Sequence, residues 1–209
     1  RPADWLAPRK GLAASGPGGG AYIRSSLNDG GDLGKVEVFR NKFENNTADA
    51  GQGGGAYVST ISAKIWIINN LCNGNRAGNG GGLCLKTSNR VNMFNNTIVH
   101  NTADAYMSVA GGTRFFGSVS TGVFHLVNNI FYSNAASDGT DVYAIRPLFL
   151  LNNWLSPPDV DDPWSWWDYV AAYENNIEPP VVPGFVNSAT DFHLAGGSAC
   201  IDAGTLTNA

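Results

Sequence analysis

The sequence is poor in charge and in long apolar runs, and each shortage excludes a class of protein. Only 14% of its 209 residues are charged, and 13 Lys and Arg against 17 Asp and Glu give a net charge of −4. Nucleic-acid binding depends on clustered cations, so the composition predicts no nucleic-acid partner. No apolar run approaches the roughly 20 residues that a membrane-spanning helix needs, which predicts no transmembrane segment.

Cysteine is also scarce. Three cysteines cannot all pair, so they form no disulfide framework. By contrast, 26 glycines argue against a mainly helical fold, and 43% apolar residues are too many for a disordered chain. The composition therefore predicts turn-rich β structure. Few charges together with abundant Asn, Gly, Ser, Thr and Tyr favour an extracellular or cell-surface protein.

Asparagine pairs recur where short apolar runs end, and they mark an internal repeat. Counted from Asn41, which follows Arg40 in the same place upstream, the second members are spaced by 29, 26, 33 and 24 residues, a range typical of solenoids. These reference positions are Asn41, Asn70, Asn96, Asn129 and Asn153. The residues five and three places before each reference are apolar, which predicts a strand that buries one face. A second column follows five places after the first four references, at Asn46, Asn75, Asn101 and Asn134.

Glycine clusters open another strand in each repeat, as "GGGAYI" at 18–23, "GGGAYV" at 53–58 and "GGGLCL" at 80–85. Both Gly and Asn favour tight turns. Strands separated by such turns pair best with the equivalent strand of the next repeat, so each repeat is predicted to be one coil. Stacking then places asparagines above one another, where their amides satisfy each other in ladders and avoid a cost of roughly 1–3 kcal/mol each.

This combination of an asparagine pair after a strand, a second asparagine five residues on and then "GGG" resembles the right-handed parallel β-helix of pectate-lyase-like proteins. It is most similar to bacterial surface proteins with polymorphic outer-membrane-protein repeats and the choice-of-anchor Q domain. The segment "PGFVNSATDFHLAGGSACIDAGT" at 183–205 is similar to the closing segment of choice-of-anchor Q proteins. The resemblance implies an all-β solenoid of about six to eight coils, with asparagine ladders and glycine-rich turns.

The whole chain, 1–209, is predicted to be a single β-helix domain and part of a longer protein. Within it, 183–205 is the terminal coil motif. The segment 154–173 breaks the repeat with prolines, acids and four tryptophans, which predicts an insertion loop.

Candidate ligand-binding residues form an outward row on the glycine-initiated strands. The row consists of Tyr22, Tyr57, Cys84, Arg114 and Tyr143. Aromatic rings beside an arginine can stack on sugar rings and bind a carboxylate. Tyrosines also suit exposed strand positions without any ligand, and the sequence leaves this alternative open.

The loop offers a second set of candidates. Trp164, Trp166 and Trp167 can form a carbohydrate platform or pack the loop against the solenoid. Asp159, Asp161 and Asp162 can offer oxygen ligands to Ca²⁺, although their spacing lacks the pattern of an EF-hand. No cofactor is required by the sequence, and Ca²⁺ is the one metal that it suggests.

Other polar residues are predicted not to form sites. Glu37 and His125 share an outward row but lie three coils apart, about 14 Å, which excludes an acid–base dyad. Cys72 is predicted to face the core and Cys84 to face outwards, which disfavours a disulfide between them. Cys200 is predicted to be buried.

Two functions remain open. The first is an extracellular or cell-surface scaffold, adhesin-like, that binds polysaccharide or a surface partner, or that self-associates through its coil ends. The second is a polysaccharide lyase or glycoside hydrolase that acts on an acidic polysaccharide. The sequence favours the scaffold, because it places no catalytic set of carboxylates and bases together.

Overall fold

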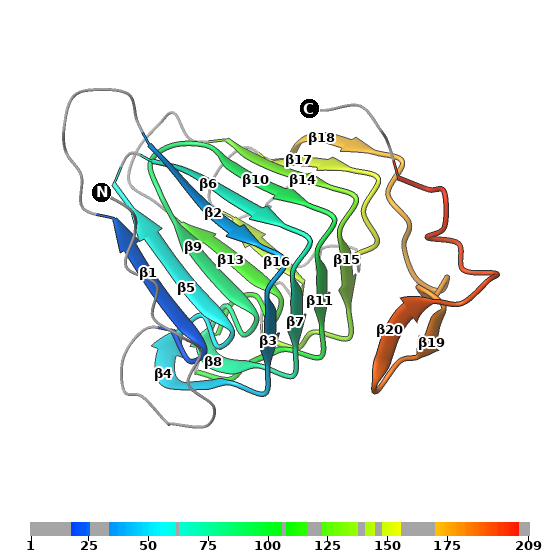
Figure 1. Cartoon of the computed structure of the whole chain (residues 1–209), viewed down its shortest axis with the longest axis horizontal. Coiled ribbons are helices and arrows are strands. Elements are labelled where there is room, and N and C mark those ends of the chain that lie inside the picture. Colours follow the sequence, from blue (N-terminus) through cyan, green and yellow to red (C-terminus); the bar gives the residue numbers. More distant parts are fainter. Residues whose placement is uncertain are drawn as a thin grey trace.

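A computed structural model describes residues 18–25, 34–61, 63–105, 108–116, 123–137, 141–144, 148–155 and 170–204. These residues form 20 strands, and no helix occurs among them. The strands wind into a stacked solenoid with the glycine-initiated strands on one side (Figure 1). Within this described part, no helix is long and apolar enough to cross a membrane.

Four parallel sheets run along the solenoid and form its walls. Sheet A holds the glycine-initiated strands β1 (Ala21–Ser25), β5 (Ala56–Thr60), β9 (Leu83–Lys86), β13 (Thr113–Phe116) and β16 (Val142–Ala144). Sheet B holds the strands before the first asparagine corner: β2 (Lys35–Phe39), β6 (Lys64–Ile68), β10 (Val91–Phe94), β14 (Phe124–Val127), β17 (Leu148–Leu151) and β18 (Val170–Glu174).

The two smaller sheets follow the asparagine corners. Sheet C consists of β3 (Lys42–Glu44), β7 (Leu71–Asn73), β11 (Thr97–Val99) and β15 (Ile130–Tyr132). Sheet D consists of β4 (Thr47–Gln52), β8 (Arg76–Asn79) and β12 (Thr102–Ala103). The first three coils run from A through B and C to D and then rise to the next A strand, and the fold is the predicted right-handed parallel β-helix. Among the described residues, sheet A has five strands and sheet B has six, so the number of coils differs slightly from the predicted six to eight.

The period of two in the sequence fixes which side chains enter the core. On sheet B, Ile65, Ile67, Val91 and Met93 are fully buried. After the corner, Phe43, Cys72, Ile98 and Phe131 enter the same core cluster. The predicted strand register is therefore confirmed on both sheets. All three cysteines are free thiols, with Cys72 in the core.

The first asparagine column is a continuous ladder between sheets B and C. Each side-chain Nδ2 donates to the Oδ1 of the asparagine on the next coil, as from Asn70 to Asn96 at 3.0 Å and from Asn96 to Asn129 at 2.9 Å. Predicted members Asn41, Asn70, Asn96, Asn129 and Asn153 all take part. The ladder continues to Asn176, at 3.1 Å from Asn153. This sixth member belongs to the pair Asn175-Asn176, which repeats the motif 23 residues after Asn153.

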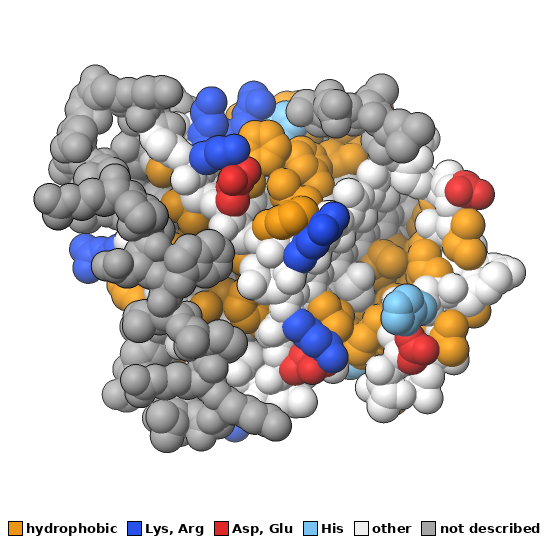
Figure 2. All heavy atoms as spheres, in the orientation of Figure 1, with side chains coloured by type: hydrophobic (Ala, Val, Ile, Leu, Met, Phe, Trp, Pro, Cys, Tyr) orange, Lys and Arg blue, Asp and Glu red, His pale blue; other side chains and the backbone are white. Residues whose placement is uncertain are grey.

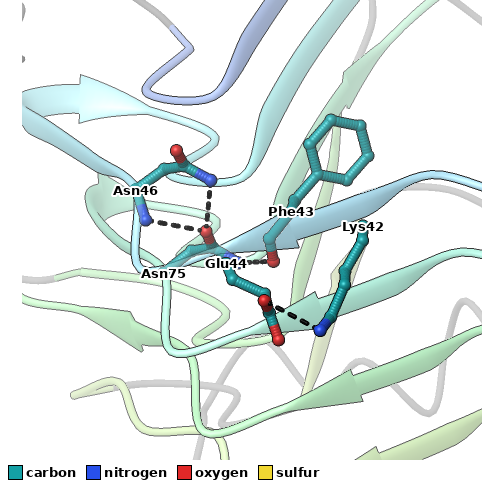
Figure 3. A network of polar contacts seen from close by, with 5 residues as sticks. All are labelled: Lys42, Phe43, Glu44, Asn46 and Asn75. Atoms are coloured by element: carbon teal, nitrogen blue, oxygen red, sulfur yellow. Dashed lines mark hydrogen bonds and ion pairs between the residues drawn. The ribbon is translucent and has the colours of Figure 1, made fainter. Parts of the chain in front are cut away.

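The second column forms a parallel ladder between sheets C and D. Asn46 donates to Asn75 at 3.0 Å, beside the surface ion pair Lys42–Glu44 (Figure 3). The ladder continues through Asn101 to Asn134. Asn134 then donates to the carboxylate of Asp141 at 2.9 Å, so an acid takes the place of a further asparagine.

The residue before each ladder asparagine turns the chain. Asn69, Asn95, Asn128 and Asn152 have φ between 54° and 58°. Asparagine tolerates this left-handed region better than most residues do. The two members of an asparagine pair therefore differ in role: the first makes the turn and the second forms the ladder.

The C-terminal motif folds as an antiparallel hairpin of β19 (Phe185–Asn187) and β20 (Asp191–Leu194). It packs on the outer side of sheet C, where Phe185 lies 5.9 Å from Tyr132 between ring centroids. His100 lies against Phe192 at 6.0 Å, and its Nε2 is 2.6 Å from the carbonyl of Ser188. Val99 on β11, the residue before His100, is fully buried.

Candidate functional site

The outer face of sheet A brings the predicted row together. Tyr22, Tyr57, Cys84, Arg114 and Tyr143 are direct partners on successive strands. The rings of Tyr22 and Tyr57 stack with centroids 5.5 Å apart and an interplanar angle of 15°. Tyr22 is 40% exposed, whereas Tyr57 is only 9% exposed. Burial is the main reason that the pKa of Tyr57 lies above its ordinary value.

A second outward row lies two residues further along the same strands. It contains Arg24, Ser59, Lys86 and Phe116 in register. The Arg114 guanidinium lies 4.9 Å from the Phe116 ring centroid, and the Lys86 Nζ lies 5.3 Å from it. Both distances fit cation–π contacts. Sequence reasoning missed Arg24 and Lys86, although the period of two that placed Tyr22 and Cys84 outside places these cations beside them.

Cys84 faces outwards as predicted, yet it is fully buried. Because its side chain is small, Tyr57 and Phe116 approach each other over it, with ring centroids 6.4 Å apart. The Cys84 thiol lies 3.4 Å from the Gln52 side-chain oxygen. Burial raises the pKa of Cys84 to about 12, although Arg114 and Lys86 favour the thiolate. The thiol is thus protonated at neutral pH.

The charge on sheet A is of one sign. Its described strands carry Arg24, Lys86 and Arg114 and no carboxylate. The described ion pairs lie elsewhere, such as Lys35–Glu37 on sheet B, Lys42–Glu44 on sheet C and Arg76–Asp104 on sheet D. Moreover, the Arg114 Nε is buried and has no hydrogen-bond partner in the described residues. This face can therefore accept a negatively charged ligand without first breaking an ion pair.

The outer face of sheet B differs in character. Figure 2 shows hydrophobic side chains gathered over it, with Lys and Arg near them. Trp66 packs on Phe94 at 5.7 Å, and His125 stacks on Phe149 at 4.7 Å between ring centroids. Glu37 pairs with Lys35 at 2.8 Å rather than with an imidazole. Glu37 and His125 lie on strands β2 and β14, which are separated by β6 and β10, so the predicted absence of a dyad is confirmed.

The remaining candidates have different outcomes. Trp164, Trp166, Trp167, Asp159, Asp161 and Asp162 lie outside the described residues. Where the structure describes the chain, no three His, Cys, Asp or Glu side chains come together as a metal site. The prediction that Cys200 is buried is wrong, because the residue is half-buried. It lies in a turn of the C-terminal segment rather than in a solenoid strand, so it is not enclosed in the core.

Comparison with known proteins supports the fold seen in the structure. The family described as "Right handed beta helix region" matches residues 14–156, which is more than half of the chain. No curated protein and no solved structure matches the chain significantly. The finer resemblance to choice-of-anchor Q and polymorphic-repeat proteins stays a prediction. With its four parallel sheets, its two buried ladders and this match, the chain belongs to the right-handed β-helix family.

Proposed function

We propose that the chain is an extracellular or cell-surface scaffold that binds an acidic polysaccharide across the outer face of sheet A. One observation carries the proposal: Arg24, Lys86 and Arg114 have no carboxylate partner in the described residues and lie beside the stacked rings of Tyr22 and Tyr57. Guanidinium and ammonium groups bind carboxylates or sulfates, and tyrosine rings pack on the apolar faces of sugars.

The geometry favours an extended ligand. The strands of sheet A are stacked about 4.8 Å apart, so the cations and rings form a strip along the solenoid axis. A polymer with one anionic group on every few sugar units can contact several cations at once. Binding of this kind weakens as salt screens the charges, with a Debye length of about 10 Å at 0.1 M salt.

The test is a titration of purified protein with polygalacturonate, alginate and heparin, with neutral dextran as the comparison. We expect the double variant Lys86→Gln/Arg114→Gln to lose at least about tenfold in affinity, since each charged contact is worth roughly 1.5–3 kcal/mol. Lys64→Gln is the matched control, because Lys64 is an exposed cation on sheet B. Equal binding by both variants, or no binding of any acidic polymer, would exclude this face as the site.

The alternative function, a lyase or hydrolase, is tested in the same samples. Cleavage would shorten the polymer, and a lyase would leave unsaturated uronate ends that absorb ultraviolet light. Binding without either change supports the scaffold. Self-association through the coil ends stays a separate prediction, which sedimentation velocity over a range of protein concentrations tests.

A further inference from the structure

A groove of about 530 Å³ lies between the first asparagine corner and the C-terminal segment, away from sheet A. One wall is a row of corner asparagines on successive coils: Asn95, Asn128 and Asn152. The opposite wall is formed by Cys200, Asp202, Ala203 and Gly204, and apolar side chains of Ile130, Ile177 and Leu194 also line it. Its volume falls within the range of small-ligand sites.

The corner asparagines present their amides because of their backbone conformation. Their left-handed φ values, 55°, 58° and 54°, turn the chain at one point on each coil. The ladder uses the following residues, Asn96, Asn129 and Asn153, and leaves the corner amides outside the core. In the described part of the chain, the side chains of Asn95 and Asn152 make no hydrogen bond.

The backbone of this wall is already engaged. The N–H groups of Asn95, Asn128 and Asn152 donate to carbonyls of the next coil at 3.2, 3.1 and 2.9 Å. They cannot pair with an added peptide strand, which would need free backbone donors. A ligand in this groove must therefore be recognised by side-chain amides, which both donate and accept hydrogen bonds.

The charged groups among the lining residues limit the class of ligand that the groove can bind. Among the described residues that line the groove, Asp202 is the one charged residue and none is Lys or Arg. A carboxylate accepts hydrogen bonds from hydroxyl groups and repels anions. Amides and a carboxylate beside apolar side chains match the hydroxyl groups and C–H faces of an uncharged sugar.

The opposite wall is held in place by its own contacts. The Ser198 hydroxyl donates to the Pro183 carbonyl, and the Cys200 N–H donates to the Ser198 Oγ at 3.0 Å. Gly204 lies against Asn128, since a Cβ on this glycine would stand 3.2 Å from the Asn128 side chain. Such preorganisation lowers the cost of ordering the site when a ligand binds.

We propose that this groove binds a neutral oligosaccharide that runs along the solenoid axis and is recognised by the side-chain amides of Asn95 and Asn152. These two asparagines lie two coils apart, about 10 Å at a coil spacing of about 4.8 Å, so alternate sugar units of an extended chain meet the two amides. This site is independent of the acidic-polysaccharide face on sheet A. Its ligand is uncharged, so its affinity is insensitive to salt.

The test is calorimetric titration with tetrasaccharides of glucose, mannose, xylose and N-acetylglucosamine, all uncharged. We expect at least one to bind in the millimolar range or tighter, and the double variant Asn95→Gly/Asn152→Gly to bind it roughly tenfold more weakly. Glycine keeps the left-handed corner while removing the amide. Asn69→Gly is the matched control, because Asn69 has the same φ of 54° and does not line the groove.

Amide side-chain NMR signals of Asn95 and Asn152 should shift during the titration, whereas that of Asn69 should not. The proposal is overturned if none of the four sugars binds, or if the double variant binds as well as the unchanged protein. It is also overturned if the loss occurs in Lys86→Gln/Arg114→Gln, which would place the sugar on sheet A. Failure of acidic polymers to bind leaves these outcomes unaffected, so the two proposals are tested separately.

Discussion

The side-chain Oδ1 of Asn96 accepts two hydrogen bonds from Asn70, one from its backbone N–H at 2.9 Å and one from its Nδ2 at 3.0 Å. Asn96 in turn donates from its own Nδ2 to the Ile67 carbonyl at 2.8 Å. Its Nδ2 also donates to the Asn129 Oδ1 on the following coil at 2.9 Å, so one buried amide bonds to polar groups on both neighbouring coils. The same arrangement repeats along the ladder and holds the coils in register.

Replacing Asn96 with alanine should be strongly destabilising. The Asn70 N–H would lose its acceptor and the Ile67 carbonyl would lose a donor, both in buried positions. We expect a loss of about 3–5 kcal/mol in the free energy of unfolding, measured by urea denaturation. Asn69→Gly removes the neighbouring corner amide and should change stability by less than about 1 kcal/mol. Equal effects of the two substitutions would contradict the ladder's role.

A second prediction concerns Gly81, in the glycine-rich turn before β9. A Cβ on Gly81 would stand 2.5 Å from the Thr102 carbonyl oxygen and 2.6 Å from that of Gly111, both backbone atoms. Gly81→Ala should therefore cost about 3 kcal/mol and lower Tm by roughly 10 °C. At Gly34 an added Cβ meets nothing within 4 Å, so Gly34→Ala should leave Tm almost unchanged. Calorimetry of both variants is the measurement.

How much of the fold could be predicted from the sequence depends on whether a feature repeats within each coil or arises from contacts between residues on different strands. The asparagine corners follow from spacing alone, because each turn and ladder position repeats on every coil. The burial of Cys84 does not, since it arises when Tyr57 and Phe116, from two different strands, meet over a small side chain. No pattern within one strand contains that contact.

The candidate sites show the same division. The row from Tyr22 to Tyr143 was predictable, because register carries one outward position to the next coil. The groove was not, because its second wall comes from residues 200–204, which belong to no coil of the repeat. Similarly, the packing of Phe185 on Tyr132 joins a hairpin to a solenoid strand and has no sequence period.

The three thiols should differ sharply in reactivity. Burial raises the pKa of Cys72 and raises that of Cys84 to about 12, whereas Cys200 is half-buried with a pKa raised mainly by burial. At pH 8 the thiolate fraction of Cys84 should be about a thousandfold lower than in the unfolded chain. We expect iodoacetamide to modify Cys200 first, with Cys72 and Cys84 modified only in denaturant. Peptide mass spectrometry measures this order, and early labelling of Cys84 would contradict its burial.

His125 should make stability depend on pH on the acid side. Burial, and secondarily Arg90, hold the pKa of His125 below its ordinary value of 6.5. As pH falls through 6.5, the unfolded chain binds a proton at this residue before the folded chain does, so stability falls. His125→Phe keeps a ring to stack on Phe149 and removes the titration. Between pH 7 and pH 5, the unchanged protein should lose more stability than this variant, and parallel urea-denaturation profiles would contradict the shift.

The C-terminal hairpin should be anchored mainly by its aromatic side chains. Phe185 contacts Tyr132 and, at 5.4 Å between ring centroids, Phe192. Val186, next to it on β19, is 59% exposed and provides a matched control. We expect Phe185→Ala to lower the free energy that holds the hairpin on the solenoid by about 2–4 kcal/mol. Val186→Ala should change this free energy by less than about 0.5 kcal/mol.

Hydrogen exchange locates this effect within the chain. In Phe185→Ala, the amides of β19 and β20 should exchange faster, while the Asn101 N–H, which donates to Asn134 inside the second ladder, keeps its protection. Local release is expected because the hairpin joins the solenoid through side chains and the His100–Ser188 contact rather than through a shared sheet. Faster exchange at Asn101 as well would show that hairpin and solenoid unfold as one unit. The groove wall at residues 200–204 follows the hairpin in sequence, so Phe185→Ala should also weaken binding of a neutral oligosaccharide without changing binding at sheet A.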